Sequence, residues 1–215
     1  MGPTALVRVG PSQMSFRLPQ ALLCRQSDFF HTTFHSGFKE ANEASMSLPD
    51  VDPSTFATVV KWMYQEHLND LKGIRKSDYC EEIGQIEAAA KHRQRLHRLF
   101  ELYYLAEKLL MEPLEVQICK LLQDLMVPGR ETWTLAPRTI LNAFEKTSFT
   151  AKSPLWGFIC DELANQLGGG LGRPIEDYQE CFDKIPGLAV KVMKEAQRRQ
   201  GHGFYLPDES DEGQL

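Results

Sequence analysis

Residues 16–30 read Phe16-Arg-Leu-Pro-Gln-Ala-Leu-Leu-Cys-Arg-Gln-Ser-Asp-Phe-Phe30, and this stretch decides the fold. Apolar and polar residues alternate over 16–18, as they do in a half-buried strand. A short apolar helix is predicted from Pro19 through Leu23, because proline suits a first helical position, where its missing N–H would have no partner. Ser27 is a favourable cap for a second helix, and that helix carries Phe29, Phe30 and Phe34.

Two more strands and a longer helix surround this stretch. A short run of residues typical of strands, over 5–9, ends at Gly10-Pro11, and the turn residues that follow predict a hairpin with the strand around Phe16. Alternation of apolar residues with serine over 44–48 indicates a third strand. Asp52 then caps a helix that Pro53 begins, and its apolar stripe consists of Phe56, Val59, Val60 and Met63.

Residues 69–97 are polar and charged without a sustained apolar stripe, and we interpret them as an insertion that is partly helical around 86–95. Helical apolar stripes resume at Leu99 and again after Pro113. This order of elements predicts an α+β domain in which helices cover a small sheet.

The chain continues beyond that domain with further helical patterns. Residues 127–205 are predicted to form an all-helical extension, in which one helix ends at Gly168-Gly-Gly. Residues 206–215 are acidic and lack aromatic side chains, so we expect a disordered tail.

Composition excludes several function classes. A formal net charge of −5 argues against a general electrostatic hold on nucleic acid. The local basic run Lys91–Arg98 is either the solvated face of a helix, which we favour, or a nuclear-localisation or anion-binding patch. No apolar run approaches the roughly 20 residues that span a bilayer, and no signal peptide is evident, so we expect a cytoplasmic or nuclear protein without membrane contact.

The side chains that most often carry catalysis or bind metals form no known constellation. Five widely spaced cysteines lack zinc-site spacing and suggest free thiols in a reducing compartment. His31 and His35 have a spacing that can chelate a metal, but no third ligand is evident, so a surface or capping role is favoured. The segment Gly168–Gly172 follows a helix, where a phosphate cradle would follow a strand. We expect no enzyme, no cofactor and no metal.

Several motifs in order resemble the BTB (POZ) domain family. Residues 16–30 are similar to its second strand and first helix pair, which reads F-x-V-H-K-x-L-L-x-x-x-S-x-F-F; here Pro19-Gln20 replaces the usual His-Lys. The likeness spans residues 5–126, and it continues in Ser36-Gly-Phe-Lys-Glu-Ala41, Leu48-Pro-Asp-Val-Asp-Pro-Ser-Thr-Phe56, Trp62-Met-Tyr64 and Leu102-Tyr-Tyr-Leu-Ala-Glu-Lys-Leu109. A Gly-Phe-Lys-Glu-Ala motif with a helical extension resembles stand-alone BTB proteins of filamentous fungi.

This resemblance implies an α+β BTB fold that docks other proteins, and often the cullin scaffold of a ubiquitin ligase. Cullin-binding members carry a hydrophobic-x-Glu motif, which Phe38-Lys39-Glu40 matches, and an aromatic residue at the end of the third helix, which Tyr64 matches. Aromatic side chains are favoured interface anchors. A structural alternative stays open, in which Phe38 fills the gap between helix and strand and Tyr64 packs with its hydroxyl at the surface.

The resemblance also implies a homodimer as another assembly, although the swapped segment of homodimeric members has no counterpart before the first strand. No cargo-binding module is recognisable, so cargo would bind residues 127–215 or a partner. Trp133 and Trp156 are the anchor candidates there, with core packing the favoured interpretation. The function expected is an adaptor between a cullin-type ubiquitin ligase and a substrate. The alternative is a transcriptional regulator acting through nuclear protein partners.

Overall fold

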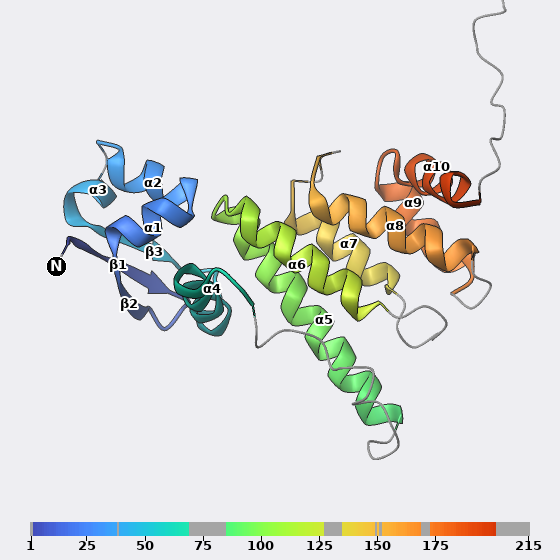
Figure 1. The fold of residues 1–215 in the computed structure, drawn as a ribbon, viewed down its shortest axis with the longest axis horizontal. Coiled ribbons are helices and arrows are strands. Elements are labelled where there is room, and N and C mark those ends of the chain that lie inside the picture. Colours follow the sequence, from blue (N-terminus) through green and yellow to red (C-terminus); the bar gives the residue numbers. More distant parts are fainter. Residues whose placement is uncertain are drawn as a thin grey trace, which may run out of the picture.

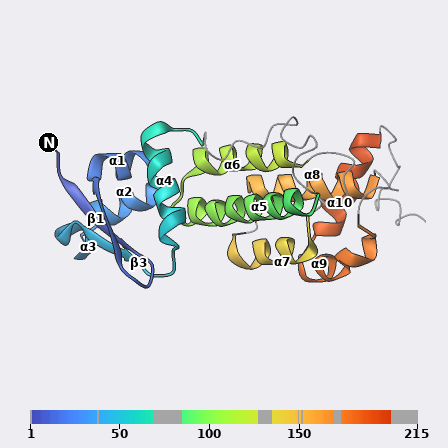
Figure 2. The same ribbon diagram turned by 90° about the horizontal axis from the view of Figure 1, so that it is seen from below.

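In the computed structural model, the described residues are 2–37, 39–68, 85–126, 135–148, 150, 152–168 and 173–200. A three-stranded sheet with its helices, which we call the sheet unit, forms one end of the molecule. A long helix pair crosses the middle, and a group of shorter helices forms the other end (Figures 1 and 2). The predicted α+β class, a small sheet flanked by helices and followed by a helical region, is confirmed.

The sheet has the order β2-β1-β3. Strand β1 (Thr4–Val9) pairs antiparallel with β2 (Met14–Pro19), which confirms the hairpin, and parallel with β3 (Ser45–Leu48). The hairpin turn needs Gly10, whose φ is +74° and whose backbone lies so close to Pro53 that an added Cβ would be 3.0 Å from the Pro53 ring.

Two short helices follow β2 as expected. Helix α1 (Gln20–Gln26) begins one residue later than predicted, because Pro19 still belongs to β2 and takes the cap position. Helix α2 (Asp28–His35) begins at the predicted cap, where the Ser27 hydroxyl accepts a hydrogen bond of 3.2 Å from the Phe30 N–H. A five-residue helix, α3 (Lys39–Glu43), was not predicted.

Helix α4 (Pro53–Gln65) starts as its sequence indicates. The Asp52 carboxylate accepts a hydrogen bond of 2.8 Å from the Thr55 N–H. Hydrogen bonds from Ser54 and Thr55 lower the pKa of Asp52. The side chains of Phe56 and Met63 are fully buried against the sheet unit.

A long helix pair joins the two ends of the molecule. Helix α5 (Gln85–Lys108) packs against α6 (Glu112–Leu125). The predicted helical part of the insertion is thus the first half of α5, while residues 69–84 lie outside the described residues. Leu102 is buried, and Val60 and Leu121 are partly buried in the same apolar cluster as Phe56, so the sheet unit and the helices share one interior.

The extension is helical throughout its described part. It contains α7 (Pro137–Lys146), α8 (Pro154–Gly168), a 3-10 turn η4 (Ile175–Tyr178), α9 (Gln179–Lys184) and α10 (Leu188–Gln200). The 3-10 turn η4 leads directly into α9. The Tyr178 hydroxyl at the end of η4 is buried and lies within hydrogen-bonding distance of two acceptors, the Leu135 carbonyl at 2.8 Å and Gln166 Oε1 at 2.5 Å.

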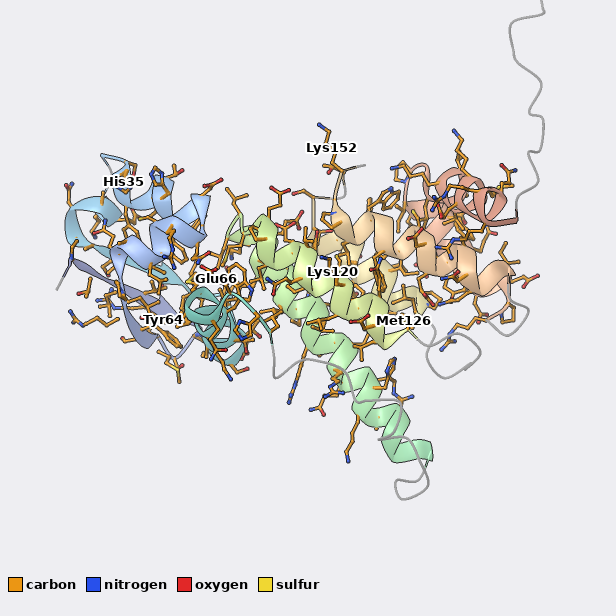
Figure 3. The ribbon with its side chains drawn as sticks, viewed as in Figure 1. His35, Tyr64, Glu66, Lys120, Met126 and Lys152 are labelled. Atoms are coloured by element: carbon orange, nitrogen blue, oxygen red, sulfur yellow. The ribbon has the colours of Figure 1, made fainter. Side chains whose placement is uncertain are left out.

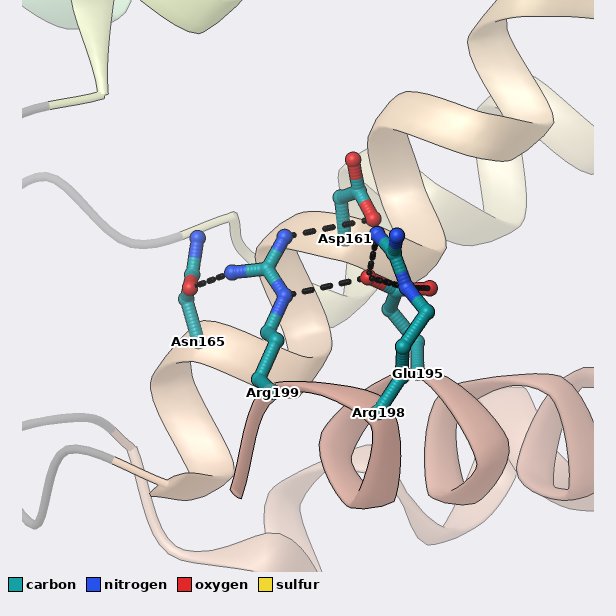
Figure 4. Close-up of polar contacts among 5 residues, drawn as sticks. All are labelled: Asp161, Asn165, Glu195, Arg198 and Arg199. Atoms are coloured by element: carbon teal, nitrogen blue, oxygen red, sulfur yellow. Dashed lines mark hydrogen bonds and ion pairs between the residues drawn. The ribbon is translucent and has the colours of Figure 1, made fainter. Parts of the chain in front are cut away.

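A polar cluster holds α10 on α8 (Figure 4). The Arg199 guanidinium contacts Asp161 at 3.2 Å and Glu195 at 3.1 Å, and it also donates to the Asn165 side-chain oxygen. The hydrogen bond from Arg198 is the main cause that lowers the pKa of Glu195 to about 2. Burial and the neighbouring Glu195 raise the pKa of Asp161.

The extension also bonds to the middle helix pair. The hydroxyl of Tyr103 on α5 donates 3.2 Å to the Glu115 carboxylate on α6 and lies 3.1 Å from the Ser153 hydroxyl just before α8. Within the described part of the chain, no helix is both long and apolar enough to traverse a bilayer.

Candidate partner-binding surface

Tyr64 stands in the last turn of α4 with 59% of its side chain exposed. Its neighbours Trp62 and Met63 are buried, at 2% and 0% exposure. The helix core thus fixes the backbone, while the aromatic ring points to solvent (Figure 3). A rigidly mounted, exposed aromatic ring loses little entropy on binding.

Side chains of α1 and α6 hold the last turn of α4, which carries Tyr64, in place. Helix α4 ends at Glu66, whose φ is +58°. The Glu66 carboxylate accepts 2.9 Å from Gln26 on α1 and lies 3.5 Å from the Arg25 guanidinium. From α6, the Gln117 side chain donates 2.9 Å to the Glu66 carbonyl and accepts 3.1 Å from the Trp62 indole. This turn is held by three helices.

A groove of about 600 Å³ lies on another side of the sheet unit. Its walls come from α2, α3, β3 and the end of α5. The lining residues are Phe29, Thr32, Thr33, Ser36, Glu40, Met46, Ser47, Leu48, Pro49, Lys108 and Leu110. The groove is mostly apolar, with one carboxylate and one ammonium group, and such a surface suits a polypeptide side chain flanked by a polar contact.

The predicted site residues fall on different parts of this surface. Glu40 is exposed on α3 and lines the groove. Tyr64 does not line it, because α1 and α2 stand between α3 and α4 (Figure 1). Phe38 lies outside the described residues. A single partner can therefore contact both Glu40 and Tyr64 only if its surface is broad enough to cover α1 and α2 as well.

Leu110 is the groove residue that sequence patterns gave no reason to select. It follows α5 with a φ of +52°, and 57% of its side chain is exposed. Glycine is the usual residue at such a helix end, and a branched apolar residue there is strained. The sequence signal was a pair of leucines at the end of a helical apolar stripe. Such a pair is equally typical of two residues that are buried in the core.

Of the two tryptophans considered as anchors in the extension, the structure describes Trp156. Trp156 is only 5% exposed, and the Lys191 ammonium lies 4.9 Å from its ring centroid, so the core-packing interpretation holds. Trp133 lies outside the described residues.

The basic run Lys91–Arg98 is helical and lies in the first half of α5. Its residues are split between faces, because His92 is buried while Lys91, Arg93, His97 and Arg98 are exposed. Burial, followed by the charges of Arg95 and Arg93, lowers the pKa of His92. The favoured interpretation, a solvated helix face, fits the four exposed residues and not His92.

The His, Cys, Asp and Glu side chains of the described residues were candidates for metal binding or catalysis in the sequence. No three of their His, Cys, Asp and Glu side chains gather as a metal site. His31 and His35 stack at 4.5 Å, and His35 Nδ1 donates 2.9 Å to the His31 carbonyl. Burial raises the pKa of the Cys119 thiol to about 12, and it also raises the pKa values of Cys24, Cys160 and Cys181. These sulfurs are thiols rather than reactive thiolates at neutral pH.

One comparison with known proteins bears on this surface. The sequence model of the BTB/POZ domain matches residues 4–125, which contain both the groove and the Tyr64 turn. No curated protein matches the chain.

Proposed function

The chain belongs to the BTB/POZ domain family, whose members bind other proteins and often dimerise, and we propose that it is an adaptor that docks a cullin-type ubiquitin ligase scaffold. The observation that carries this proposal is Tyr64, an exposed aromatic ring on a turn held by α1, α4 and α6. Glu40, at the rim of an apolar groove, also supports this proposal, because its carboxylate can accept hydrogen bonds from the scaffold.

Calorimetric titration of the full-length chain with a purified cullin scaffold tests the proposal. Loss of a central aromatic anchor typically costs on the order of 2 kcal/mol, so Tyr64→Ala should weaken binding more than tenfold. Met193→Ala is the matched control, because Met193 is 62% exposed on α10, outside the residues that match the BTB/POZ domain. Equal affinity of the two variants, or no binding by the wild type, would reject the proposal.

The role of Glu40 is tested on the same helix. Glu40→Gln keeps the side-chain shape and removes the charge at the groove. Glu43→Gln removes an equally exposed charge from α3 outside the groove, where it faces Lys39 at 3.7 Å. Scaffold affinity should fall several-fold for Glu40→Gln only. Equal loss in both variants would mean that general negative charge, and not the groove, matters.

A second candidate function is a transcriptional regulator that acts through nuclear protein partners. The exposed basic residues of α5, Lys91, Arg93 and Arg98, favour it as part of a nuclear-import signal. Fluorescent tagging of the full chain distinguishes the two proposals: a nuclear pool that disappears when these residues become glutamine supports the regulator. Strict exclusion from the nucleus rejects it and leaves a cytoplasmic adaptor.

The type of BTB protein is also part of the proposal. The motif Ser36–Ala41 and the helical extension support a likeness to stand-alone BTB proteins of filamentous fungi. In such a protein, any cargo must bind the extension or a second protein, since the BTB unit would be occupied by the scaffold.

A further inference from the structure

Strand β3 lies at an open edge of the sheet. The order β2-β1-β3 leaves one side of β3 without a neighbouring strand in the described sheet. The Leu48 carbonyl accepts a hydrogen bond of 2.9 Å from the Gly10 N–H and so points toward β1. Because backbone groups point alternately to the two sides of a strand, those of Ser45 and Ser47 point to the open side. They are placed to pair with an added strand.

The open side of β3 borders the groove at Glu40. Residues 46–49 form one wall of this groove, and Phe29 on α2 and Leu110 after α5 add apolar surface to the others. Leu110 is 57% exposed, so a bound apolar side chain would cover it. Side chains alternate between the two faces of a sheet, so a strand added to β3 directs every second side chain into the groove. The groove therefore suits an extended segment with apolar residues at alternate positions.

Two charged side chains mark the two ends of the groove. Glu40 belongs to α3, which directly precedes β3. Lys108 also lines a second pocket together with Asp50 and Val51, which come shortly after β3. Glu40 thus lies toward the start of β3, and Lys108 lies toward its end. Electrostatic complementarity favours an occupant whose acidic residues lie near the end of β3.

The residues after α10 carry this pattern. Residues 201–215 follow α10 and lie outside the described residues. Phe204 and Leu206 alternate with Tyr205, and aromatic residues are favoured in strands. Acidic side chains follow in the run Asp208-Glu209-Ser-Asp-Glu212. A strand parallel to β3 would place the two alternating apolar side chains in the groove and the acidic run near the end of β3.

The segment that can reach this groove belongs to another copy of the chain. Helix α10 and the sheet unit lie at opposite ends of the molecule, with the long helix pair between them (Figure 1). The stretch from Gln200 to Phe204 spans at most roughly 14 Å when it is fully extended. Helix α6 alone, with 14 residues, is about 21 Å long. Phe204 of one copy therefore does not reach the groove of the same copy.

We propose that the groove binds residues 203–209 of a second copy of this chain, added to β3 as a parallel strand. Backbone hydrogen bonds to Ser45 and Ser47 provide affinity, and Phe204 and Leu206 in the groove provide specificity. Two different surfaces meet in this contact, so copies associate head to tail. The proposal goes beyond scaffold docking, because self-association needs no scaffold, and a bound segment excludes the scaffold from this groove.

Fluorescence anisotropy tests the contact in a full-length chain that carries Phe204→Ser and Leu206→Ser, so that its own segment does not compete. The probe is a fluorescein-labelled peptide of residues 201–212, and its counterpart carries the same two serines. We expect the unaltered peptide to bind and the altered peptide to bind at least tenfold more weakly. Equal binding of the two peptides, or no binding of either, overturns the proposal.

Variants of the groove locate the bound peptide. On the same background, Leu110→Ser and Lys108→Glu should each weaken binding several-fold, by removing the apolar wall or reversing the charge. Met14→Ser is the matched control, because Met14 is 51% exposed on β2 at the opposite edge of the sheet. It should leave the affinity unchanged. An equal or greater loss in Met14→Ser would mean that the peptide does not bind at β3, which rejects the proposal.

Amide hydrogen exchange tests the strand addition itself. The bound peptide should slow the exchange of the Ser45 and Ser47 N–H groups, which point to the open side of β3. Unchanged exchange of both amides in the saturated complex would rule out pairing with β3.

Sedimentation equilibrium then measures self-association of the full-length chain. The average mass of the wild type should rise with concentration, and Phe204→Ser combined with Leu206→Ser should reduce this rise. An association through another face would survive these substitutions, so identical masses of variant and wild type at every concentration contradict the proposal. None of these experiments contains the scaffold, so their outcome is independent of scaffold docking.

Discussion

The Ser27 hydroxyl donates a hydrogen bond of 2.5 Å to the Leu109 carbonyl, which lies 82 positions further along the chain. The same oxygen accepts from the Phe30 N–H at 3.2 Å. One buried side chain therefore caps α2 and fastens the end of α5 to the sheet unit, so the turn after α5, which carries Leu110, is positioned by α2.

Ser27→Ala should destabilise the protein by about 2 kcal/mol, because it removes a helix cap and leaves buried backbone groups without their partner. Urea unfolding at neutral pH measures this change. Ser15→Ala is the control, since that serine is exposed on β2 and its hydroxyl donates a long hydrogen bond of 3.5 Å to the Gln13 carbonyl. A difference between the two variants below about 0.5 kcal/mol would mean that the Ser27 bonds are not formed.

Gln117→Ala should loosen the turn that carries Tyr64. The substitution leaves the Trp62 indole N–H and the Glu66 carbonyl without their α6 partner, which should cost about 1–2 kcal/mol. Because Tyr64 itself is untouched, any loss of scaffold affinity reports its positioning. We expect a several-fold weaker affinity by calorimetry. Gln123→Ala, on the exposed side of the same helix, should change neither quantity.

The local signals in the sequence predicted most of the fold. Ser27 and Asp52 cap their helices as expected because a cap is decided by residues within three positions. Helix α3 was missed because its sequence, KEANE, has Ala41 as its one apolar residue and thus no periodicity. Such a short helix owes its existence to packing against α2 and β3.

The candidate site was only partly predictable. Sequence likeness pointed to Glu40 and Tyr64, and both are exposed. The hydrogen bonds that hold the turn carrying Tyr64 could not be foreseen, because Glu66 and Gln117 are 51 positions apart.

Stability should fall in alkaline solution because of the buried thiols. Burial raises the pKa of Cys119 to about 12, and those of Cys160 and Cys181 to about 11, from 9.0 in the unfolded chain. The folded protein therefore keeps protons that the unfolded chain releases. This stabilising contribution is complete below pH 9 and is lost as the pH rises through 11 to 12.

Each thiol should reduce the free energy of unfolding by on the order of 1 kcal/mol per pH unit in this window. Urea unfolding at pH 8 and pH 10 measures the slope, under reducing conditions. Cys181→Ala should give a shallower slope than the wild type, whatever its stability at pH 8. An unchanged slope would show that this sulfur is accessible to solvent in the folded protein.

Leu110→Gly should separate stability from binding. Leu110 has a φ of +52°, which costs a residue with a side chain roughly 1–2 kcal/mol. Glycine removes this strain but raises the entropy of the unfolded chain, so we expect a net gain of up to about 1 kcal/mol in urea unfolding. Because the leucine side chain is 57% exposed, little buried area is lost.

The same substitution should weaken scaffold binding several-fold if the groove at Glu40 is used, since Leu110 forms its apolar rim. Ala44→Gly is the control: its φ is +45°, and its side chain does not line the groove. That variant should relieve strain without changing affinity. If Leu110→Gly alone gains stability and loses affinity, the strained and exposed leucine contributes to scaffold binding. If affinity is unchanged, the partner contacts Tyr64 without entering the groove.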